Sequence, residues 1–361
     1  MIVRIGQALI IACALAAAFA PVSSETIERV YSTAVYPKIQ AAVTPLSNAV
    51  PFAVFDVITV IAAIAIVVSA VLAVARVRAR RSIRPLGAWL LALSTAAAVA
   101  YLMFLGVWGL NYRRLPMGER LVLSTAPPST EQVVTLGFEA VRRINSLYEE
   151  AHRIGWEGDP RSSADLLAAF TFVQQRLLGV ADAVPGRLKS YLYGPYFRWT
   201  TVDGMVDPFA LEVLANPDLL PFERTFVAAH EWAHLAGFAD EAEANFVGFL
   251  TCVRAGAPAQ YSGWLSLYWQ IGAEVPPDVR KRLWDAVGEG PRRDVQAISD
   301  RLRRGQLPFL RDASWRVYDQ YLRANRVEEG IRSYGQVINL VLRARFEDDW
   351  VPVLRVHEPS R

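Results

Sequence analysis

The sequence His230-Glu231-Trp232-Ala233-His234 is the stretch of this chain with the clearest capacity for chemistry. Residues four apart lie on the same face of an α-helix, so the two imidazoles can bind one metal ion. Glu231 then lies beside that ion, where a carboxylate can act as a general base. The chain has only 4 histidines, and two of them are here. The pattern predicts a zinc site with His230 and His234 as ligands and Glu231 as the catalytic base.

A catalytic zinc ion takes three protein ligands and keeps one position for water, so one ligand remains to be found. Gly237 is typical of a residue that ends a helix, and three carboxylates follow it at Asp240, Glu241 and Glu243. We expect Glu241 to be the ligand, because it shares one side of the next helix with Asn245, four residues on. Glu243 is rotated about 200° from Glu241, so the two are not expected to bind one ion. Both Glu243 and Asp240 remain alternatives, since Asp240 fits the HExxHxxGxxD spacing of other zinc peptidases.

Further residues are expected to support this site. Asn245 is predicted to hold the free ring nitrogen of a ligand histidine. A peptidase also needs a donor that stabilises the transition state, and Tyr334 and Arg332 are the candidates in the C-terminal part. His152 is a weaker candidate, because its place on the helix over 129–154 is more typical of a surface histidine.

The elements that carry this site follow an apolar first third of the chain. The sequence is 53% hydrophobic, and residues 5–24, 57–75 and 86–110 carry no charge. They predict membrane spans at about residues 5–24, 55–75 and 86–110. Each has about 20 residues, enough to cross the ~30 Å core of a bilayer. The first segment also fits a cleaved signal peptide, which would leave the other two unchanged. We therefore expect a multi-pass membrane protein.

The orientation of the predicted spans follows from the loop between the second and third. That loop carries five arginines, at positions 76, 78, 80, 81 and 84. Positively charged loops remain in the cytoplasm, so the third span is predicted to lead outward. Residues 1–114 then form the transmembrane region, and residues 115–361 form a domain outside the cytoplasmic membrane.

The chain after the third span is predicted to be mainly α-helical, with a small strand component in an α+β domain. The expected helices cover residues 129–154, 164–178, 220–237, 240–255 and most of 263–345, and residues 25–50 form a structured amphipathic segment. Ser129 and Gln132 fit a capping box at the start of the first helix. The aromatic residues of 190–207 favour a strand. We expect that strand to pair with substrate beside the metal helix; an aromatic packing loop is the alternative.

Composition excludes several other classes of protein. The net charge of +3 comes partly from the arginine loop, so no nucleic-acid partner is indicated. Cys13 and Cys252 offer neither a disulfide framework nor a cysteine-rich zinc cluster. The predicted spans hold almost no ionisable groups, which argues against a transporter.

The sequence resembles two groups of proteins, and each resemblance adds to these predictions. Glu241-Ala242-Glu243-Ala244-Asn245 resembles the ExxA(D/N) element of gluzincin metallopeptidases. That resemblance implies Glu241 as metal ligand, Glu231 as base and Asn245 as the residue that orients a ligand. The seven-residue step from His234 to Glu241 is short for that group, which keeps the other two carboxylates as alternatives.

Over nearly its whole length the chain also resembles a bacterial family of membrane proteins of unknown function. The resemblance rests on the junction Trp108-Gly109-Leu110-Asn111-Tyr112-Arg113, the motif at 230–234, Glu243-Ala244-Asn245-Phe246 and Ser333-Tyr334-Gly335. It implies three N-terminal spans followed by a zincin-like domain in the inner membrane of a bacterium.

Together these patterns predict a membrane-anchored zinc metallopeptidase that hydrolyses peptide bonds in a peptide, an envelope protein or a membrane protein. The alternative is a non-catalytic zinc protein that serves as an envelope scaffold or a peptide-binding module. An open coordination position beside Glu231 favours the enzyme, whereas a closed four-ligand site favours the structural role.

Overall fold

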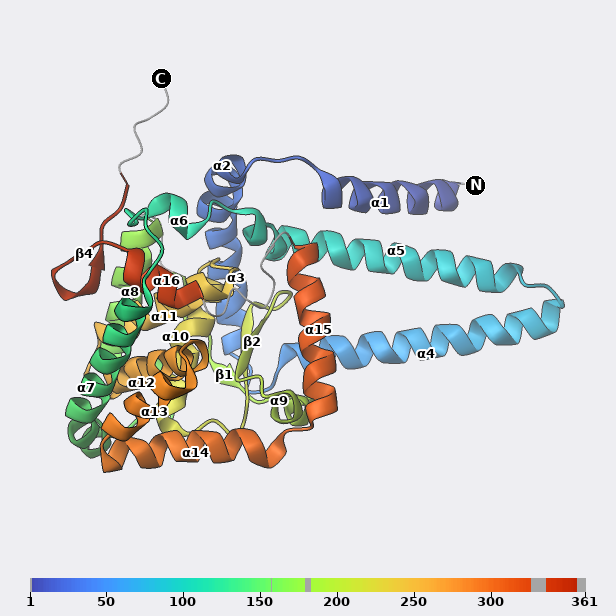
Figure 1. Ribbon diagram of the computed structural model, residues 1–361. Helices are drawn as coiled ribbons and strands as arrows, with labels where there is room; N and C mark the ends of the chain where they lie inside the picture. The colour runs from blue at the N-terminus through green and yellow to red at the C-terminus, as the bar shows by residue number, and fades with distance from the viewer. Residues whose placement is uncertain (1, 157, 179–182, 326–335, 356–361) are drawn as a thin grey trace, which may run out of the picture.

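A computed structural model describes residues 2–156, 158–178, 183–325 and 336–355 of the chain. A helical body contains most of the elements, and a long hairpin of α4 (Val54–Arg80) and α5 (Arg84–Val107) extends from it (Figure 1). Helix α1 (Ile2–Phe19) packs alongside α5. The predicted fold class, mainly helical with small sheets and apolar helices near the N-terminus, is confirmed.

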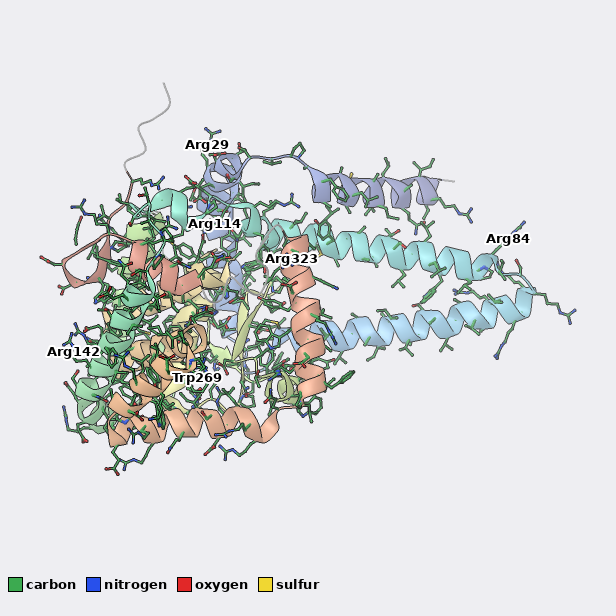
Figure 2. The ribbon with its side chains drawn as sticks, viewed as in Figure 1. Arg29, Arg84, Arg114, Arg142, Trp269 and Arg323 are labelled. Carbon is green, nitrogen blue, oxygen red and sulfur yellow. The ribbon has the colours of Figure 1, made fainter. Side chains whose placement is uncertain are left out.

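The hairpin matches the second and third predicted spans. Helices α4 and α5 are both long and apolar enough to cross a membrane. Helix α1 and the helical segment after it pass the same test only as a pair bent by 113°, so the described chain holds two such spans, or up to three. Arg84 lies at the tip of the hairpin, far from Arg114 in the body (Figure 2). The side of the membrane on which that tip lies stays a prediction.

The segment predicted at residues 25–50 is structured and packs against the body. It contains α2 (Ser24–Ile27), a π-helix (Glu28–Val35) and α3 (Tyr36–Asn48). Tyr36, Gln40 and Thr44 recur at four-residue spacing, and all three are buried. One face of this segment therefore belongs to the core of the body.

The core of the body is formed by α10 (Pro221–Leu235), α11 (Glu241–Val253) and α12 (Ala257–Glu274). Helices α7 (Thr130–Ile154) and α8 (Ala164–Leu178) pack on this core, and the capping box of Ser129 and Gln132 is confirmed. Further helices are α6 (Met117–Arg120), α13 (Pro277–Ala286), α14 (Glu289–Gly305), α15 (Pro308–Ala324) and α16 (Gln336–Arg343). Short 3₁₀ turns cover Gly109–Arg113, Pro160–Ser162 and Asp348–Trp350.

A small sheet lies beside the core helices in the order β1 (Leu188–Lys189), β3 (Glu212–Ala215) and β2 (Gly204–Asp207). Strand β1 is parallel to β3, and β2 is antiparallel to it, so β2 is an edge strand. A second sheet pairs β4 (Phe346–Glu347) with β5 (Val351–Pro352).

The strand predicted over residues 190–207 is wrong in its first half. Residues Gly194–Thr200 form helix α9, which has Pro195 at its first turn. Proline there needs no backbone N–H partner, and Phe197 and Thr200 are buried three residues apart, as a helix requires. Aromatic strand propensity was outweighed by this helical burial pattern, and only β2 at the end of the segment is a strand.

Candidate metal centre

The motif residues lie in the last two turns of α10, and a tight turn returns the chain beside them. Gly237 has a φ of +88°, so it ends the helix in the left-handed conformation that the sequence predicted. Its N–H donates to His234 O over 2.9 Å, and Phe238 N–H donates to Ala233 O over 3.1 Å. Because the turn is so short, α11 begins at Glu241 against the motif face of α10.

This turn brings His230, His234 and Glu241 together. One ligand atom from each side chain lies within 4.8 Å of the other two. Glu241 Oε2 is 3.4 Å from His230 Nε2 and 3.6 Å from His234 Nε2. The three side chains that the sequence predicted as ligands therefore converge on one point.

The two alternative carboxylates face other groups. Asp240 is the N-cap of α11, where its Oδ1 accepts hydrogen bonds from the N–H groups of Ala242 and Glu243 at 2.9 and 3.1 Å. Glu243 accepts a 2.5 Å hydrogen bond from the N–H of Met117. Neither belongs to the cluster of potential ligands, as the helical rotation between Glu241 and Glu243 implied.

Hydrogen bonds orient two of the three potential ligands. His234 Nδ1 lies 2.7 Å from the carbonyl oxygen of Phe238, which leaves Nε2 directed at Glu241. The hydroxyl of Tyr318, on α15, donates to Glu241 Oε1, which leaves Oε2 directed at the two imidazoles. Backbone and carboxylate partners of this kind fix metal-binding side chains in place.

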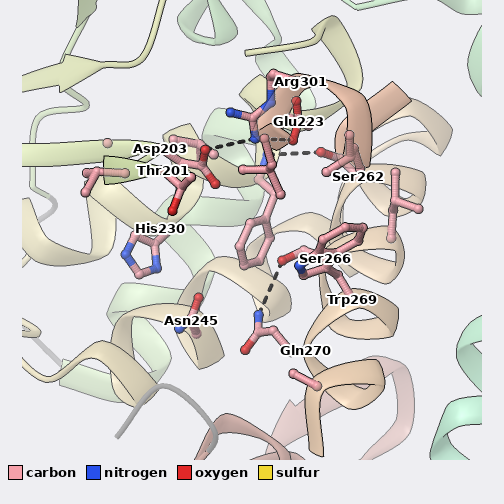
Figure 3. Close-up of a pocket in the computed structure, with 18 of the residues that line it drawn as sticks. Thr201, Asp203, Glu223, His230, Asn245, Ser262, Ser266, Trp269, Gln270 and Arg301 are labelled. Carbon is pink, nitrogen blue, oxygen red and sulfur yellow. Dashed lines mark hydrogen bonds and ion pairs between the residues drawn. The ribbon is translucent and has the colours of Figure 1, made fainter. Parts of the chain in front are cut away.

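Asn245 was predicted to hold one of the imidazoles. No hydrogen bond in the described part of the chain joins Asn245 to either ring, and His230 Nδ1 is buried without a hydrogen-bond partner. Asn245 does line the same cleft as His230 (Figure 3). Its supporting role stays a prediction.

The electrostatics of the cluster are those of closely coupled ionisable groups. Burial lowers the pKa of His234, but the Glu241 carboxylate outweighs it and raises that pKa to about 9. Burial raises the pKa of Glu241, but the two histidines outweigh it and hold that pKa well below its usual range. The site thus stabilises a negative carboxylate beside a positive charge, whether that charge is a proton or a metal ion.

Glu231 lies next to this cluster in a different environment. Burial raises its pKa to about 7, although both histidines oppose that shift. Its Oε2 has no hydrogen-bond partner among the described residues. Strand β2 covers the other oxygen so closely that a Cβ at Gly204 would collide with Glu231 Oε1. Glu231 is therefore a confined carboxylate with one buried oxygen that no described residue pairs.

A cleft of about 390 Å³ opens beside His230 and Glu231. Figure 3 shows His230 and Asn245 facing Ser266, Trp269 and Gln270 across it. The walls come from α10, α11, α12, α14 and the start of β2, and Trp315 of α15 also lines it. The cleft offers space for a ligand next to the convergent side chains.

The buried guanidinium of Arg301 forms two ion pairs at one end of the cleft. Arg301 Nη2 donates to Asp203 Oδ1 over 2.9 Å and to Glu223 Oε1 over 2.7 Å (Figure 3). Arg301 belongs to α14, Glu223 to the first turn of α10, and Asp203 directly precedes β2. This network fixes β2 against the motif helix.

Of the predicted transition-state donors, the structure places only His152. Tyr334 and Arg332 lie outside the described residues. His152 Nε2 is 2.8 Å from Asp294 Oδ2 near the end of α7, and His152 is not among the residues that line the cleft.

Sequence reasoning missed Tyr318, Gly204 and Arg301. Tyr318 is 77 residues from Glu241, and Arg301 is 98 residues from Asp203, so no local spacing connects them. The position of Gly204 could have indicated its contact, because a glycine inside a predicted strand often marks the close approach of another group.

Comparison with known proteins places the chain in a family. The family model described as "Protein of unknown function (DUF3810)" matches residues 31–342. No curated protein and no solved structure matches the chain. The expected resemblance to a family of unknown function over most of the chain is confirmed.

Proposed function

We propose that this chain, which belongs to the DUF3810 family of proteins of unknown function, is a membrane-anchored zinc metallopeptidase. The observation that carries the proposal is the convergence of His230, His234 and Glu241 beside Glu231 and an adjoining cleft. The two or three apolar helices suggest the membrane association.

The side chains at the cluster fit a zinc ion. Two imidazole nitrogens and one carboxylate oxygen form a ligand set typical of catalytic zinc sites. Glu241 Oε2 is buried without a hydrogen-bond partner among the described residues although it faces both Nε2 atoms, so these residues leave a potential ligand atom unsatisfied. His230, His234 and Glu241 would hold the ion. A zinc ion held there would supply a Lewis acid that lowers the pKa of bound water toward ~7.

Glu231 supplies the acid–base chemistry in this proposal. Its free Oε2 accepts a proton from the attacking water and later delivers that proton to the leaving amine. The contact with Gly204 restricts where the carboxylate can point, so Glu231 needs little reorganisation before the reaction.

Strand β2 is the proposed binding edge for an extended peptide. It is the outer strand of its sheet, and Gly204 at its start lies against Glu231. A peptide that adds to such an edge forms main-chain hydrogen bonds, so its sequence need not be specified by them. The scissile bond would then lie over the motif helix, and side chains of the substrate would enter the cleft.

The test uses the full-length protein purified in detergent. Zinc and iron contents are measured by elemental analysis, and cleavage of a mixed peptide library is followed by mass spectrometry. Glu231→Gln is expected to keep its zinc and to lose cleavage by at least ~100-fold. Glu241→Gln is expected to lose zinc and cleavage together. Glu289→Gln is the matched control, because this side chain is 90% exposed on α14.

Equal cleavage by wild type and Glu231→Gln would refute Glu231 as the base. Undiminished zinc in Glu241→Gln would refute Glu241 as the third ligand.

A non-catalytic zinc protein is the second candidate, and one contact favours it. The Tyr318 hydroxyl reaches Glu241 and stands close to the cluster, where it could close the coordination position that a peptidase leaves open. Under this alternative the protein is an envelope scaffold or a peptide-binding module. Wild type then retains zinc without cleaving any peptide, and Glu231→Gln binds peptides as well as wild type.

A further inference from the structure

The body carries an exposed apolar surface on α9, α15 and their connecting segments. Six of its members have exposed fractions from 39% to 76%, namely Leu192, Tyr196, Trp199, Leu307, Phe309 and Val317. The two helices are joined directly, since Leu307 N–H donates to Trp199 O over 3.1 Å and the hydroxyls of Tyr196 and Ser314 lie 2.6 Å apart. We call these six residues the α9–α15 surface. Soluble proteins rarely expose so many large apolar side chains together.

The α9–α15 surface lies at the base of the transmembrane hairpin. Leu192 N–H donates to Asp56 in the first turn of α4 over 2.8 Å. At the other end of α15, the ring of Tyr321 lies 6.4 Å from that of Phe104 in the last turn of α5. Figure 1 shows α15 crossing the hairpin where α4 leaves the body and α5 returns to it. The contacts with α4 and with α5 thus place the α9–α15 surface at the level where the hairpin meets the body.

Helix α15 has two different sides. A step of 100° per residue puts Phe309, Arg316 and Val317 within about 100° of one another around the helix axis, and all three are exposed. Trp315 and Tyr318 lie on the opposite side, where Trp315 lines the cleft and Tyr318 contacts Glu241. Helix α15 therefore has one side toward the cleft and the opposite side exposed.

A lipid bilayer fits this surface better than a protein partner does. The surface continues the exposed apolar faces of α4 and α5, which are the helices suited to span a membrane. Trp and Tyr side chains favour the boundary between lipid and water, and arginines such as Arg316 can reach lipid phosphates from there. The composition is thus that of an interfacial helix.

We propose that the α9–α15 surface lies in the interfacial region of the same bilayer that α4 and α5 cross. This goes beyond the proposed function and does not depend on zinc or on catalysis. If the proposed function also holds, the cleft lies directly above the bilayer surface. Its substrates are then peptide segments that emerge from, or lie on, that surface.

Depth-dependent fluorescence quenching tests the placement on the full chain. Cys13→Ser removes the exposed cysteine, while Cys252 is buried and stays unlabelled. Phe309→Cys and Val317→Cys are each labelled with an environment-sensitive fluorophore and reconstituted into phosphatidylcholine vesicles. Some vesicles carry spin-labelled lipid with the label near the headgroup, and others carry it near the end of the acyl chain.

Two further positions calibrate the measurement. Val68→Cys, on α4 and 51% exposed, reports the bilayer interior, and Arg142→Cys, with 66% of its side chain exposed on α7, reports water. Phe309 and Val317 labels are expected to be quenched several-fold more strongly than the Arg142 label, and best by the shallow spin label. Quenching no stronger than at Arg142 would overturn the proposal. So would crosslinking of these positions between two copies of the chain, because a second copy would then cover the surface.

Discussion

Removal of one hydroxyl group on α15 is expected to weaken metal binding without removing any ligand. Tyr318 donates to Glu241 Oε1 while Glu241 Oε2 faces both imidazoles, so the hydroxyl fixes which oxygen points at the cluster. A hydrogen bond to a charged group contributes about 1.5–3 kcal/mol. Loss of partners that orient metal ligands lowers metal affinity about 10- to 100-fold, which corresponds to about 1.4–2.8 kcal/mol. The two estimates agree, and we expect Tyr318→Phe to raise the Kd for zinc by that factor.

The assay is a competition titration of the purified full-length protein with a zinc chelator of known affinity. Tyr196→Phe is the matched control, because the Tyr196 hydroxyl also contacts α15, at Ser314, but lies away from the metal cluster. A general loosening of α15 would affect both variants alike, whereas loss of the contact with Glu241 affects only Tyr318→Phe. A zinc Kd within twofold of wild type in Tyr318→Phe would refute the orienting role.

Three further substitutions test other contacts around the site. Gly204→Ala is expected to lower peptide cleavage at least ~10-fold with unchanged zinc content, because the new Cβ displaces Glu231; unchanged kcat/KM would contradict this. Trp108→Phe removes the donor that lies 3.2 Å from His234 O, which keeps the Gly237 N–H as a donor, and is expected to cost about 0.5–1.5 kcal/mol of stability, measured by thermal denaturation in detergent; a melting temperature equal to that of wild type would count against it. Burial raises the pKa of Asp207 to about 6, so its contribution to stability is full below about pH 4 and is lost as the pH rises through about 6. Asp207→Asn is expected to flatten the fall in melting temperature over that pH range, and an unchanged slope would refute the assignment.

The parts of the fold that the sequence predicted are those governed by local patterns. Uncharged runs of sufficient length identified α4 and α5, and the capping box identified the start of α7 at Ser129. The sequence also predicted the members of the metal cluster, because two of them are four residues apart and Gly237 indicates the turn before Glu241. Helical rotation alone was enough to separate Glu241 from Glu243.

The parts that could not be predicted depend on contacts between distant segments. Nothing near Tyr318 indicates that its hydroxyl reaches Glu241, because the two meet only after α15 packs across the body. The error over residues 190–200 has a different origin. Aromatic residues favour strands on average, but here Phe197 is buried on one side of a short helix while Trp199 stays exposed, and burial outweighs intrinsic propensity.

The same kind of long-range contact links the predicted transmembrane region to the metal helix. The last carbonyl groups of a helix lack partners within it and need donors from elsewhere. At the end of α10, Tyr36 donates to Leu235 O over 2.8 Å, Trp108 to His234 O over 3.2 Å and Arg114 to Gly237 O over 2.7 Å.

All three donors precede residue 115, where the sequence predicts that the outer domain begins, and all three carbonyls lie within or just after the motif. The His234 carbonyl also accepts from the Gly237 N–H, so loss of these donors would leave the carbonyls of Leu235 and Gly237 unsatisfied. At about 1–3 kcal/mol for each buried carbonyl, that loss is a large fraction of the stability of an ordinary domain. The N-terminal region is therefore more than an anchor, because it completes the helix that presents His230 and His234. The family match points the same way, since it runs from residue 31 to residue 342 and includes the three donors together with the cluster.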